Sequence, residues 1–375
     1  MASDVSLVFV ELGAAILGLA ILGRLANRWG FSAIPLYLLA GLAFGNGGLA
    51  PLKVSAEFIH IGAEIGVLLL LFMLGLEYTG DDLKNSLRRG IAPGVVDLVL
   101  NFPPGLIAGL LLGWKLLPAV LLGGITYISS SGVIAKILSE LGRLNNPETP
   151  AILSVLVLED LAMAAYLPIM AVLLAGGDPA HIAVSVSIAV TAVFLVLFIA
   201  IRYGNSLSRF AAHQSDEIIL LSVLGTVLLV GGIAQRLQVS AAIGAFLVGT
   251  AVSGPMWEQS HRLISPLRDF FAATFFFFFG LQISPASLVS VLAIAAGLGL
   301  ATAITKIASG YWGARRLGAD TRAALRAGVV LIARGEFSIV IAGLGATIEP
   351  RLEALSAAYV LLLALLGPIL ARTIK

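Results

Sequence analysis

The sequence predicts an all-α integral membrane protein with about thirteen transmembrane helices in two inverted six-helix repeats. Three observations predict this fold class: the composition, the spacing of apolar runs and the distribution of basic residues. Of the 375 residues, 59% are apolar and only 12% are Asp, Glu, Lys or Arg, whereas soluble domains carry roughly 25% of these charged types. This composition excludes a soluble enzyme and a disordered protein. The net charge of +2 is too small for a nucleic-acid binder.

Thirteen apolar runs are long enough to serve as spans, because a helix needs about 20 such residues to cross the hydrocarbon. The connections between them are short and rich in turn residues, as in Gly45-Asn46-Gly47-Gly48, so none of them holds a soluble domain. The lack of cysteine excludes a disulfide framework and a thiolate metal site. The predicted spans are 5–23, 32–50, 58–76, 91–113, 116–139, 149–175, 180–201, 216–234, 239–254, 265–282, 287–313, 326–347 and 354–372.

The distribution of Lys and Arg predicts the orientation of the chain in the cell membrane. The N-terminal side of the first span, Met-Ala-Ser-Asp, has no basic region, so this span is not expected to be a cleaved signal peptide. Counted over alternate connections and the span ends next to them, 17 basic residues fall on one side and four on the other, while Lys306 and Arg334 fall deeper within spans. Because basic connections face the cytoplasm, the N-terminus is predicted outside and the C-terminus inside.

The thirteen spans divide into a first repeat at 1–175, a linking span within 176–215 and a second repeat at 216–375. After an odd number of spans the second repeat enters the membrane from the opposite side, which makes the repeat inverted. The whole chain is expected to form one transmembrane domain. It ends at Lys375, directly after the last span, so no cytosolic regulatory domain is expected within it.

Two spans at matching positions in the repeats are predicted to be interrupted. The fifth contains Ser129, Ser130 and Ser131 before a glycine, and the twelfth contains Arg334-Gly335-Glu336. Serines weaken a lipid-buried helix but supply hydroxyl and carbonyl oxygens. Broken helices at corresponding positions therefore predict a binding site near the membrane midplane. The alternative is that the serines only allow close helix packing.

An acidic pair, Glu159-Asp160, lies about eleven residues into the sixth span and hence near mid-membrane. An ionised carboxylate at that depth is costly unless it is paired, hydrated or protonated. The same oxygen atoms therefore favour holding either a proton or a cation, which is the chemistry of exchange. We assign exchange and binding of the monovalent cation to Asp160, and we expect Glu159 to be its supporting partner or a second, coupled titrating group. A salt-bridged structural pair is the alternative.

Several further charges lie inside predicted spans and need partners. Lys306 is expected either to reach Asp160 and leave it when the cation binds, or to extend its ammonium to the inner interface. Arg334 and Glu336 flank a glycine, so we expect them to neutralise opposing half-helix dipoles and to fix where the broken helices cross. Asp97 is expected to face an interior polar surface.

Six stretches of sequence, from the fifth span to the twelfth, form a specific set although each alone is a weak signal. They are Ile-Ser-Ser-Ser-Gly-Val-Ile-Ala-Lys-Ile-Leu (128–138), Asn-Pro-Glu-Thr (146–149), Leu-Glu-Asp-Leu (158–161) with Tyr-Leu (166–167), Ala-Ile-Gly-Ala-Phe-Leu-Val-Gly (242–249), Leu-Arg-Asp-Phe-Phe (267–271) with Phe-Phe-Phe-Gly-Leu (277–281), and Arg-Gly-Glu-Phe-Ser-Ile (334–339). In this order they resemble the membrane domain of the bacterial monovalent cation:proton antiporters of the Kef and KhtU group. Within the group the likeness is to K+/H+ antiporters of the KhtU type, whose mid-membrane pair also ends in Asp.

The resemblance implies a homodimer of thirteen-span subunits that works by an elevator motion. Spans 1–3 and 8–10 would form the dimer and scaffold domain. Spans 4–6 and 11–13 would form the moving core, with the fifth and twelfth crossing as broken helices. The resemblance implies that Asp160 binds the cation and the proton alternately, with the serines at 129–131 beside it. It also implies that Lys306, Arg334 and Glu336 balance the charge of the core.

Two departures from the family pattern bear on the ion and on regulation. Related antiporters have Asp-Asp, Asn-Asp or Gln-Asp at mid-membrane, whereas this chain has Glu159-Asp160, which leaves the ion and the stoichiometry open. The nucleotide-binding or gating domain that often follows the last span in the family is not in this sequence. Regulation is therefore expected either from a separate cytosolic subunit or from a cytosolic domain of a longer native chain.

The sequence thus predicts exchange of a monovalent cation, in the first place K+, for protons, with Na+ as the competing ion. No cofactor and no nucleic acid are expected, and the expected partners are a second copy of the chain and membrane lipid. A gated cation channel without proton coupling is the alternative from a different class. An intramembrane enzyme is disfavoured, because the sequence has no His/Glu metal pair and no spacing of a nucleophile and a base.

Overall fold

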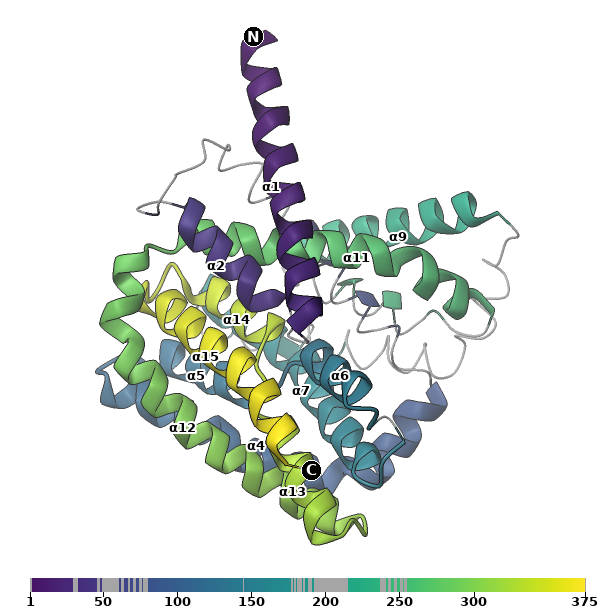
Figure 1. The fold of residues 1–375 in the computed structure, drawn as a ribbon, viewed down its shortest axis with the longest axis vertical. Coiled ribbons are helices and arrows are strands. Elements are labelled where there is room, and N and C mark those ends of the chain that lie inside the picture. The colour runs from purple at the N-terminus through teal and green to yellow at the C-terminus, as the bar shows by residue number, and fades with distance from the viewer. Residues whose placement is uncertain are drawn as a thin grey trace. The chain divides into compact units, whose positions relative to one another are not determined.

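The computed structural model describes residues 2–29, 33–45, 80–143, 145–176, 215–236 and 255–374, together with scattered positions in 48–76, 178–191 and 241–252. Within this described part every regular element is a helix (Figure 1). Six helices in it are long and apolar enough to cross a membrane: Gly90–Leu111, Thr149–Ala175, Asp216–Ala234, Glu258–Leu281, Pro285–Arg316 and Arg351–Thr373. The chain is therefore an all-helical, multi-pass membrane protein.

Most of the predicted spans coincide with helices of the structure. Most of spans 58–76, 180–201 and 239–254, and most of the linker 176–215, lie outside the described residues. The helices are α1 (Ala2–Trp29), α2 (Ile34–Phe44), α4 (Gly80–Leu111), α5 (Leu116–Tyr127), α6 (Ser131–Glu140), α7 (Thr149–Ala175), α9 (Asp216–Arg236), α11 (Pro255–Gln282), α12 (Pro285–Arg316), α13 (Thr321–Val330), α14 (Glu336–Gly345) and α15 (Arg351–Thr373).

Two helices begin well before their predicted spans. α4 begins at Gly80 and α11 at Pro255, whereas the apolar runs predict 91 and 265. Hydropathy marks only the part of a helix that lies in hydrocarbon, and polar turns such as Asp81–Arg89 continue the helix beyond that part. Proline suits the first turn of α11, because its missing amide would have no helical partner there.

The chain folds into two compact units. The first comprises residues 1–63, 90–156 and 273–375, and the second comprises 64–89 and 157–272. The boundaries fall inside α4, α7 and α11, so each of these helices contributes residues to both units. The serines at 129–131, Lys306 and Arg334 belong to the first unit, whereas Glu159 and Asp160 belong to the second.

Close backbone contacts hold the helices of the first unit together. α12 packs against α13 and α15, and α14 packs against α5 and α15 (Figure 1). A Cβ atom on Gly310 of α12 would lie 2.7 Å from the Cα of Gly328 in α13, so only glycine fits at that contact. Likewise, a Cβ on Gly280 of α11 would lie 2.5 Å from the carbonyl oxygen of Leu38 in α2. Such small-residue contacts are the usual means by which membrane helices approach one another.

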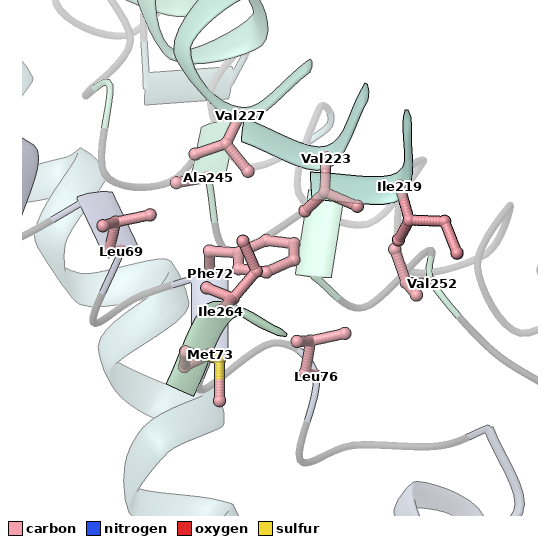
Figure 2. Packing of buried hydrophobic residues seen from close by; sticks show 10 residues of the cluster. All are labelled: Leu69, Phe72, Met73, Leu76, Ile219, Val223, Val227, Ala245, Val252 and Ile264. Atoms are coloured by element: carbon pink, nitrogen blue, oxygen red, sulfur yellow. The ribbon is translucent and has the colours of Figure 1, made fainter. Parts of the chain in front are cut away.

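The second unit has an apolar core, shown in Figure 2. One face of α9 contributes Ile219, Val223 and Val227, which recur every four residues and so lie above one another on the helix. Figure 2 shows this row beside Phe72 and Ile264. The remaining buried members of the cluster are Leu69, Met73, Leu76, Ala245 and Val252.

Candidate functional site

Two interruptions divide the predicted fifth and twelfth spans. α5 ends at Tyr127 and α6 begins at Ser131, which leaves residues 128–130 between them. α13 ends at Val330 and α14 begins at Glu336, which leaves residues 331–335 between them. Both connecting segments are buried. Non-helical backbone at membrane depth is tolerated only where protein groups enclose it, so burial explains how these breaks persist.

The two interruptions contact each other through hydrogen bonds to the backbone carbonyls of the second. The amide of Ser130 donates to the carbonyl of Ala333 at 2.9 Å, and the hydroxyl of Ser129 donates to the carbonyl of Leu331 at 3.0 Å. Gly335 is required by this approach, because a Cβ there would lie 2.5 Å from the Oγ of Ser130. Residues about 200 positions apart therefore form one compact polar centre in the first unit.

The predicted serines lie at this contact. Ser129 and Ser130 are each 1% exposed, and Ser131, the first residue of α6, is half-buried. The Oγ of Ser130 accepts a hydrogen bond from the amide of Val133 at 3.3 Å and so caps the N-terminus of α6. The hydroxyls of Ser129 and Ser130 thus satisfy backbone groups that the interruptions release. Their role as cation ligands stays a prediction.

Arg334 is fully buried and joins the C-terminal ends of both broken helices. Its Nη1 donates to the carbonyls of Leu331 and Ile332, just after α13, at 3.0 and 3.1 Å. Its Nη2 donates to the carbonyl of Thr126, near the end of α5, at 3.0 Å. Because these carbonyls form the negative ends of the helix dipoles, the guanidinium stabilises both ends at once. Its Nε donates to the hydroxyl of Tyr359 in α15 at 3.1 Å.

A buried ion pair joins α4 to α12. The Nζ of Lys306 lies 2.5 Å from the Oδ2 of Asp97, and both side chains are 0% exposed. The Oδ1 of Asp97 accepts hydrogen bonds from the hydroxyl of Ser309 at 2.6 Å and from the amide of Asn101 at 2.9 Å. The Lys306 ammonium also lies 5.4 Å from the ring centre of Tyr127, the last residue of α5. Both charges are therefore paired and hydrogen-bonded, as buried charges must be.

The pair with Asp97 changes the interpretation of Lys306. The expectation that its ammonium extends to the inner interface is wrong, because the side chain is enclosed by protein. Its predicted contact with Asp160 stays a prediction. The sequence does not reveal Asp97 as a partner, since 209 positions separate the two residues. The sequence does show that Asp97 and Asn101 are four residues apart and hence share one face of an apolar helix, which indicates that this face meets polar groups.

Further hydrogen bonds connect the ion pair to the interruptions. The hydroxyl of Thr305 donates to the side-chain oxygen of Asn101 at 2.7 Å, and the hydroxyl of Thr126 donates to the carbonyl of Asn101 at 2.9 Å. The hydroxyl of Tyr359 lies 2.9 Å from the Oγ1 of Thr302. None of these residues stands out in the sequence, because single polar groups in apolar helices are common. The structure alone shows that they form one network.

The acidic pair occupies the middle of α7 in the second unit. Glu159 is 0% exposed and Asp160 is 1% exposed. The binding of a proton or a cation by this pair stays a prediction. The meeting of Asp160 with the serines of the first unit stays a prediction. Glu336 is the first residue of α14, and its side chain lies outside the described residues.

A second charged cluster surrounds Glu148, directly before α7. Its carboxylate accepts hydrogen bonds from Nε and Nη2 of Arg326 at 2.6 and 3.0 Å. Burial raises the pKa of Glu148, but the hydrogen bonds, above all those from Arg326, outweigh this effect and hold the pKa below its ordinary value. Arg143, in the same connection, donates to the carbonyl of Ala371 near the end of α15 at 3.1 Å. The sequence motif around Glu148 predicts the family but not this cluster.

Known proteins are similar to this chain in sequence and in fold over almost its whole length. The family model described as "Sodium/hydrogen exchanger, transmembrane" matches residues 14–374. The chain is 34% identical to the K(+)/H(+) antiporter subunit KhtU of Bacillus subtilis, over 97% of this chain and 93% of the relative. It is 29% identical to the ammonium/H(+) antiporter subunit AmhT of Alkalihalophilus pseudofirmus, over 96% and 91%. The fold resembles that of the sodium proton antiporter MjNhaP1 from Methanocaldococcus jannaschii, with a TM-score of 0.72 and 15% identity over 99% of both chains.

Proposed function

We propose that this chain, which belongs to the transmembrane sodium/hydrogen exchanger family, exchanges K+ for protons across the membrane. As a member of that family it is a transporter for monovalent cation/proton antiport and not an enzyme. The choice of K+ follows from its similarity to KhtU, which is named as a K(+)/H(+) antiporter subunit. The observation that carries the exchange chemistry is the buried acidic pair Glu159-Asp160 in an apolar helix.

Asp160 is the proposed group that binds the cation and the proton in turn. When its carboxyl is ionised, a buried site needs a compensating charge, which a dehydrated monovalent cation supplies. When it is protonated, the site is neutral and the cation leaves. Because both ligands compete for the same oxygens, uptake of one on one side of the membrane drives release of the other. Glu159 adds negative charge next to this group and is proposed to titrate together with it.

The polar centre of the first unit is the proposed source of further ligands. Hydroxyl oxygens of Ser129, Ser130 and Ser131 and carbonyls of the interruptions are the oxygen donors that broken membrane helices offer to monovalent cations. Lys306 and Arg334 already interact with protein groups, so we assign them fixed charges that balance the core. The same balancing role is proposed for Glu336 at the start of α14.

The proposed architecture is thirteen spans in two inverted repeats, at 1–175 and 216–375, joined by a linking span within 176–215. In support, the order of a long helix, a broken helix and a long helix occurs twice: α4, α5–α6 and α7, then α12, α13–α14 and α15. Spans 4–6 and 11–13 are proposed to move as an elevator against spans 1–3 and 8–10. The N-terminus is placed outside and the C-terminus in the cytoplasm, in accord with the basic residues.

Two protein partners are part of the proposal. A second copy of the chain forms a homodimer, which anchors the scaffold in the membrane while the core moves. A separate cytosolic subunit regulates transport. KhtU and AmhT are each named as a subunit, which supports a partner of this kind for the present chain.

Two other ions are alternatives to K+. Na+ is the second candidate, because the family model and MjNhaP1 are both named for sodium. Ammonium is the third, because AmhT is named as an ammonium/H(+) antiporter subunit. Ion selectivity depends on small differences in the placement of oxygen ligands, so only transport measurements distinguish the three.

The test is transport in proteoliposomes with an acidic interior, in which a pH-sensitive dye reports the proton gradient. K+, Rb+, Na+, Li+ and NH4+ are added separately, with protein-free liposomes as the control for NH3 diffusion. K+ and Rb+ are expected to dissipate the gradient at the lowest concentrations. If only Na+ and Li+ dissipate the gradient, the transported cation is Na+ and not K+. Cation flux without any change in the gradient would show a channel instead of an antiporter.

A further inference from the structure

The proposed exchange chemistry assigns no role to the buried hydroxyl of Tyr359 in α15. The side chain is 0% exposed. Its oxygen lies 3.1 Å from the Nε of Arg334 and 2.9 Å from the Oγ1 of Thr302 in α12. The hydroxyl therefore stands between the interruptions and the helix that carries the buried lysine.

The number of protons that each group has limits the directions of these hydrogen bonds. A guanidinium only donates, so the oxygen of Tyr359 accepts from Arg334. The carbonyl of Leu298 only accepts, and it lies 2.9 Å from the Oγ1 of Thr302, so Thr302 can donate its single proton there. In the bond between Tyr359 and Thr302 either hydroxyl can be the donor; when Thr302 donates to the carbonyl of Leu298 or of Gly299, Tyr359 donates to Thr302. In that arrangement the hydrogen bonds form a relay from Arg334 through both hydroxyls to α12.

The bond to Tyr359 is the one that orients Arg334 through its Nε, beside the bonds of the other two nitrogens. The guanidinium is a rigid plane, so a bond that fixes Nε also fixes the directions of the other two nitrogens. Those nitrogens bond the carbonyls that end α5 and α13. The carbonyl of Leu331 accepts from both Arg334 and the hydroxyl of Ser129. A rotation of the guanidinium would therefore displace Ser129 and the backbone beside it.

We propose that Tyr359 is a positioning residue of the exchange site, which orients Arg334 and thereby holds the interruptions in the geometry that binds the cation. This inference rests on the proposed K+/H+ exchange and on the serines as its ligands. Loss of the hydroxyl leaves the Nε of Arg334 buried without its acceptor, so the guanidinium turns and the ligands move. Cation binding weakens, and a given concentration of K+ then competes with protons only at a higher pH.

The test compares the wild-type chain with Tyr359→Phe in the proteoliposome assay, over a series of K+ concentrations and of pH values. The apparent KM for K+ is expected to rise on the order of tenfold, as for other groups that orient a metal ligand. The maximal rate is expected to change little, and the pH of half-maximal activity at fixed K+ is expected to increase. A purely structural role would instead lower the amount of active protein, and hence the maximal rate, at an unchanged KM.

Two further variants control the interpretation. Ser356→Ala is the matched control, because Ser356 is buried one turn earlier in α15 and its hydroxyl donates within its own helix to the carbonyl of Leu352. It is expected to keep the KM and the pH profile. Thr302→Val interrupts the relay beyond Tyr359. It is expected to raise the apparent KM and the pH of half-maximal activity, as Tyr359→Phe does. The double variant is expected to equal Tyr359→Phe alone, since Thr302 acts through Tyr359.

An unchanged KM and pH profile in Tyr359→Phe overturns the proposal, and so does an equal shift in Ser356→Ala. If Tyr359→Phe does not assemble in the membrane, Thr302→Val decides the question by the same two measurements. A wild-type chain that exchanges no cation for protons overturns the proposed function instead. The two failures are thus distinguishable.

Discussion

Asp97 in α4 and Asp160 in α7 are both buried carboxylates of apolar helices, but their neighbours give them different chemistry. Asp97 has a resident cation, Lys306, at 2.5 Å and a hydrogen bond from Ser309 at 2.6 Å. Asp160 follows another acid, Glu159, in the chain. A buried carboxylate paired with a cation of the protein is part of the fold, because breaking the pair is strongly destabilising. Two adjacent acids concentrate negative charge that a mobile cation or a proton balances.

The difference teaches that burial alone does not mark a transport group. Among the described residues, Asp97, Glu148, Glu159 and Asp160 are all acids with almost no exposed surface. Asp97 and Glu148 each have a basic side chain of the protein within 3 Å, Lys306 at 2.5 Å and Arg326 at 2.6 Å. For these two we expect a substitution to change stability, whereas for Asp160 we expect it to change exchange.

Asp160→Asn is expected to have the largest effect on exchange. The amide keeps the shape of the side chain but neither takes up a proton nor balances a cation, so pH-driven K+ exchange should fall to the level of protein-free liposomes. The melting temperature in detergent should stay close to that of the wild type. Glu159→Gln removes the neighbouring charge and is expected to keep exchange at a changed rate. Persisting exchange in Asp160→Asn would end the assignment of this residue.

Lys306→Met tests the role of Asp97, the other carboxylate of the comparison. It leaves the charge of Asp97 buried without its cation, which is expected to cost about 3–5 kcal/mol of unfolding free energy. The measurement is the midpoint of thermal unfolding in detergent. The double variant Asp97→Asn/Lys306→Met should recover most of the loss, because no uncompensated charge remains. If Lys306→Met keeps its stability but loses exchange, the lysine serves transport and the division between the two carboxylates is wrong.

Glu148 extends the comparison to a carboxylate outside the membrane spans. Burial opposes its ionisation, but the hydrogen bonds from Arg326 prevail and its pKa in the folded chain lies below the ordinary 4.5. A lowered folded pKa stabilises the fold fully above the unfolded value, and this contribution is lost as the pH falls through the folded pKa. The wild type should therefore lose more stability than Glu148→Gln when the pH falls from neutral to below 4.5. At neutral pH the substitution should cost about 1–3 kcal/mol. Equal acid sensitivity of both proteins would contradict this.

The sequence predicts those features whose cause is local. The run of serines at 129–131 weakens the helix where it stands, and α5 indeed ends at Tyr127. Arg334-Gly335-Glu336 does the same for the twelfth span, where α13 ends at Val330. The acidic pair needs only its depth in an apolar run to stand out. In each case the signal and the structural feature lie within one or two helical turns.

Pairings between distant residues are not predictable in this way. Which buried acid meets Lys306 depends on how α4 and α12 are rotated about their axes, and helix packing sets that rotation. Close contacts such as Gly310 with Gly328 show how finely it is set. Tyr359 is an ordinary apolar-helix residue in the sequence, and its bond to Arg334 exists only in the folded chain. Hydropathy finds the helices but not the faces that they turn to one another.

The smallest effect is expected at Arg262 and Asp216, an ion pair of the second unit. Its N–O distance of 2.8 Å is similar to that of the pair between Lys306 and Asp97, so distance alone would rank the two alike. Its side chains, however, are 65% and 52% exposed. Water and salt screen such a pair, which contributes about 0–1 kcal/mol. Arg262→Ala should therefore shift unfolding by less than about 1 kcal/mol, less still at high salt, and leave exchange unchanged. A loss as large as that of Lys306→Met would mean that distance rather than burial ranks these ion pairs. The reason for treating Asp97 as part of the fold would then be gone.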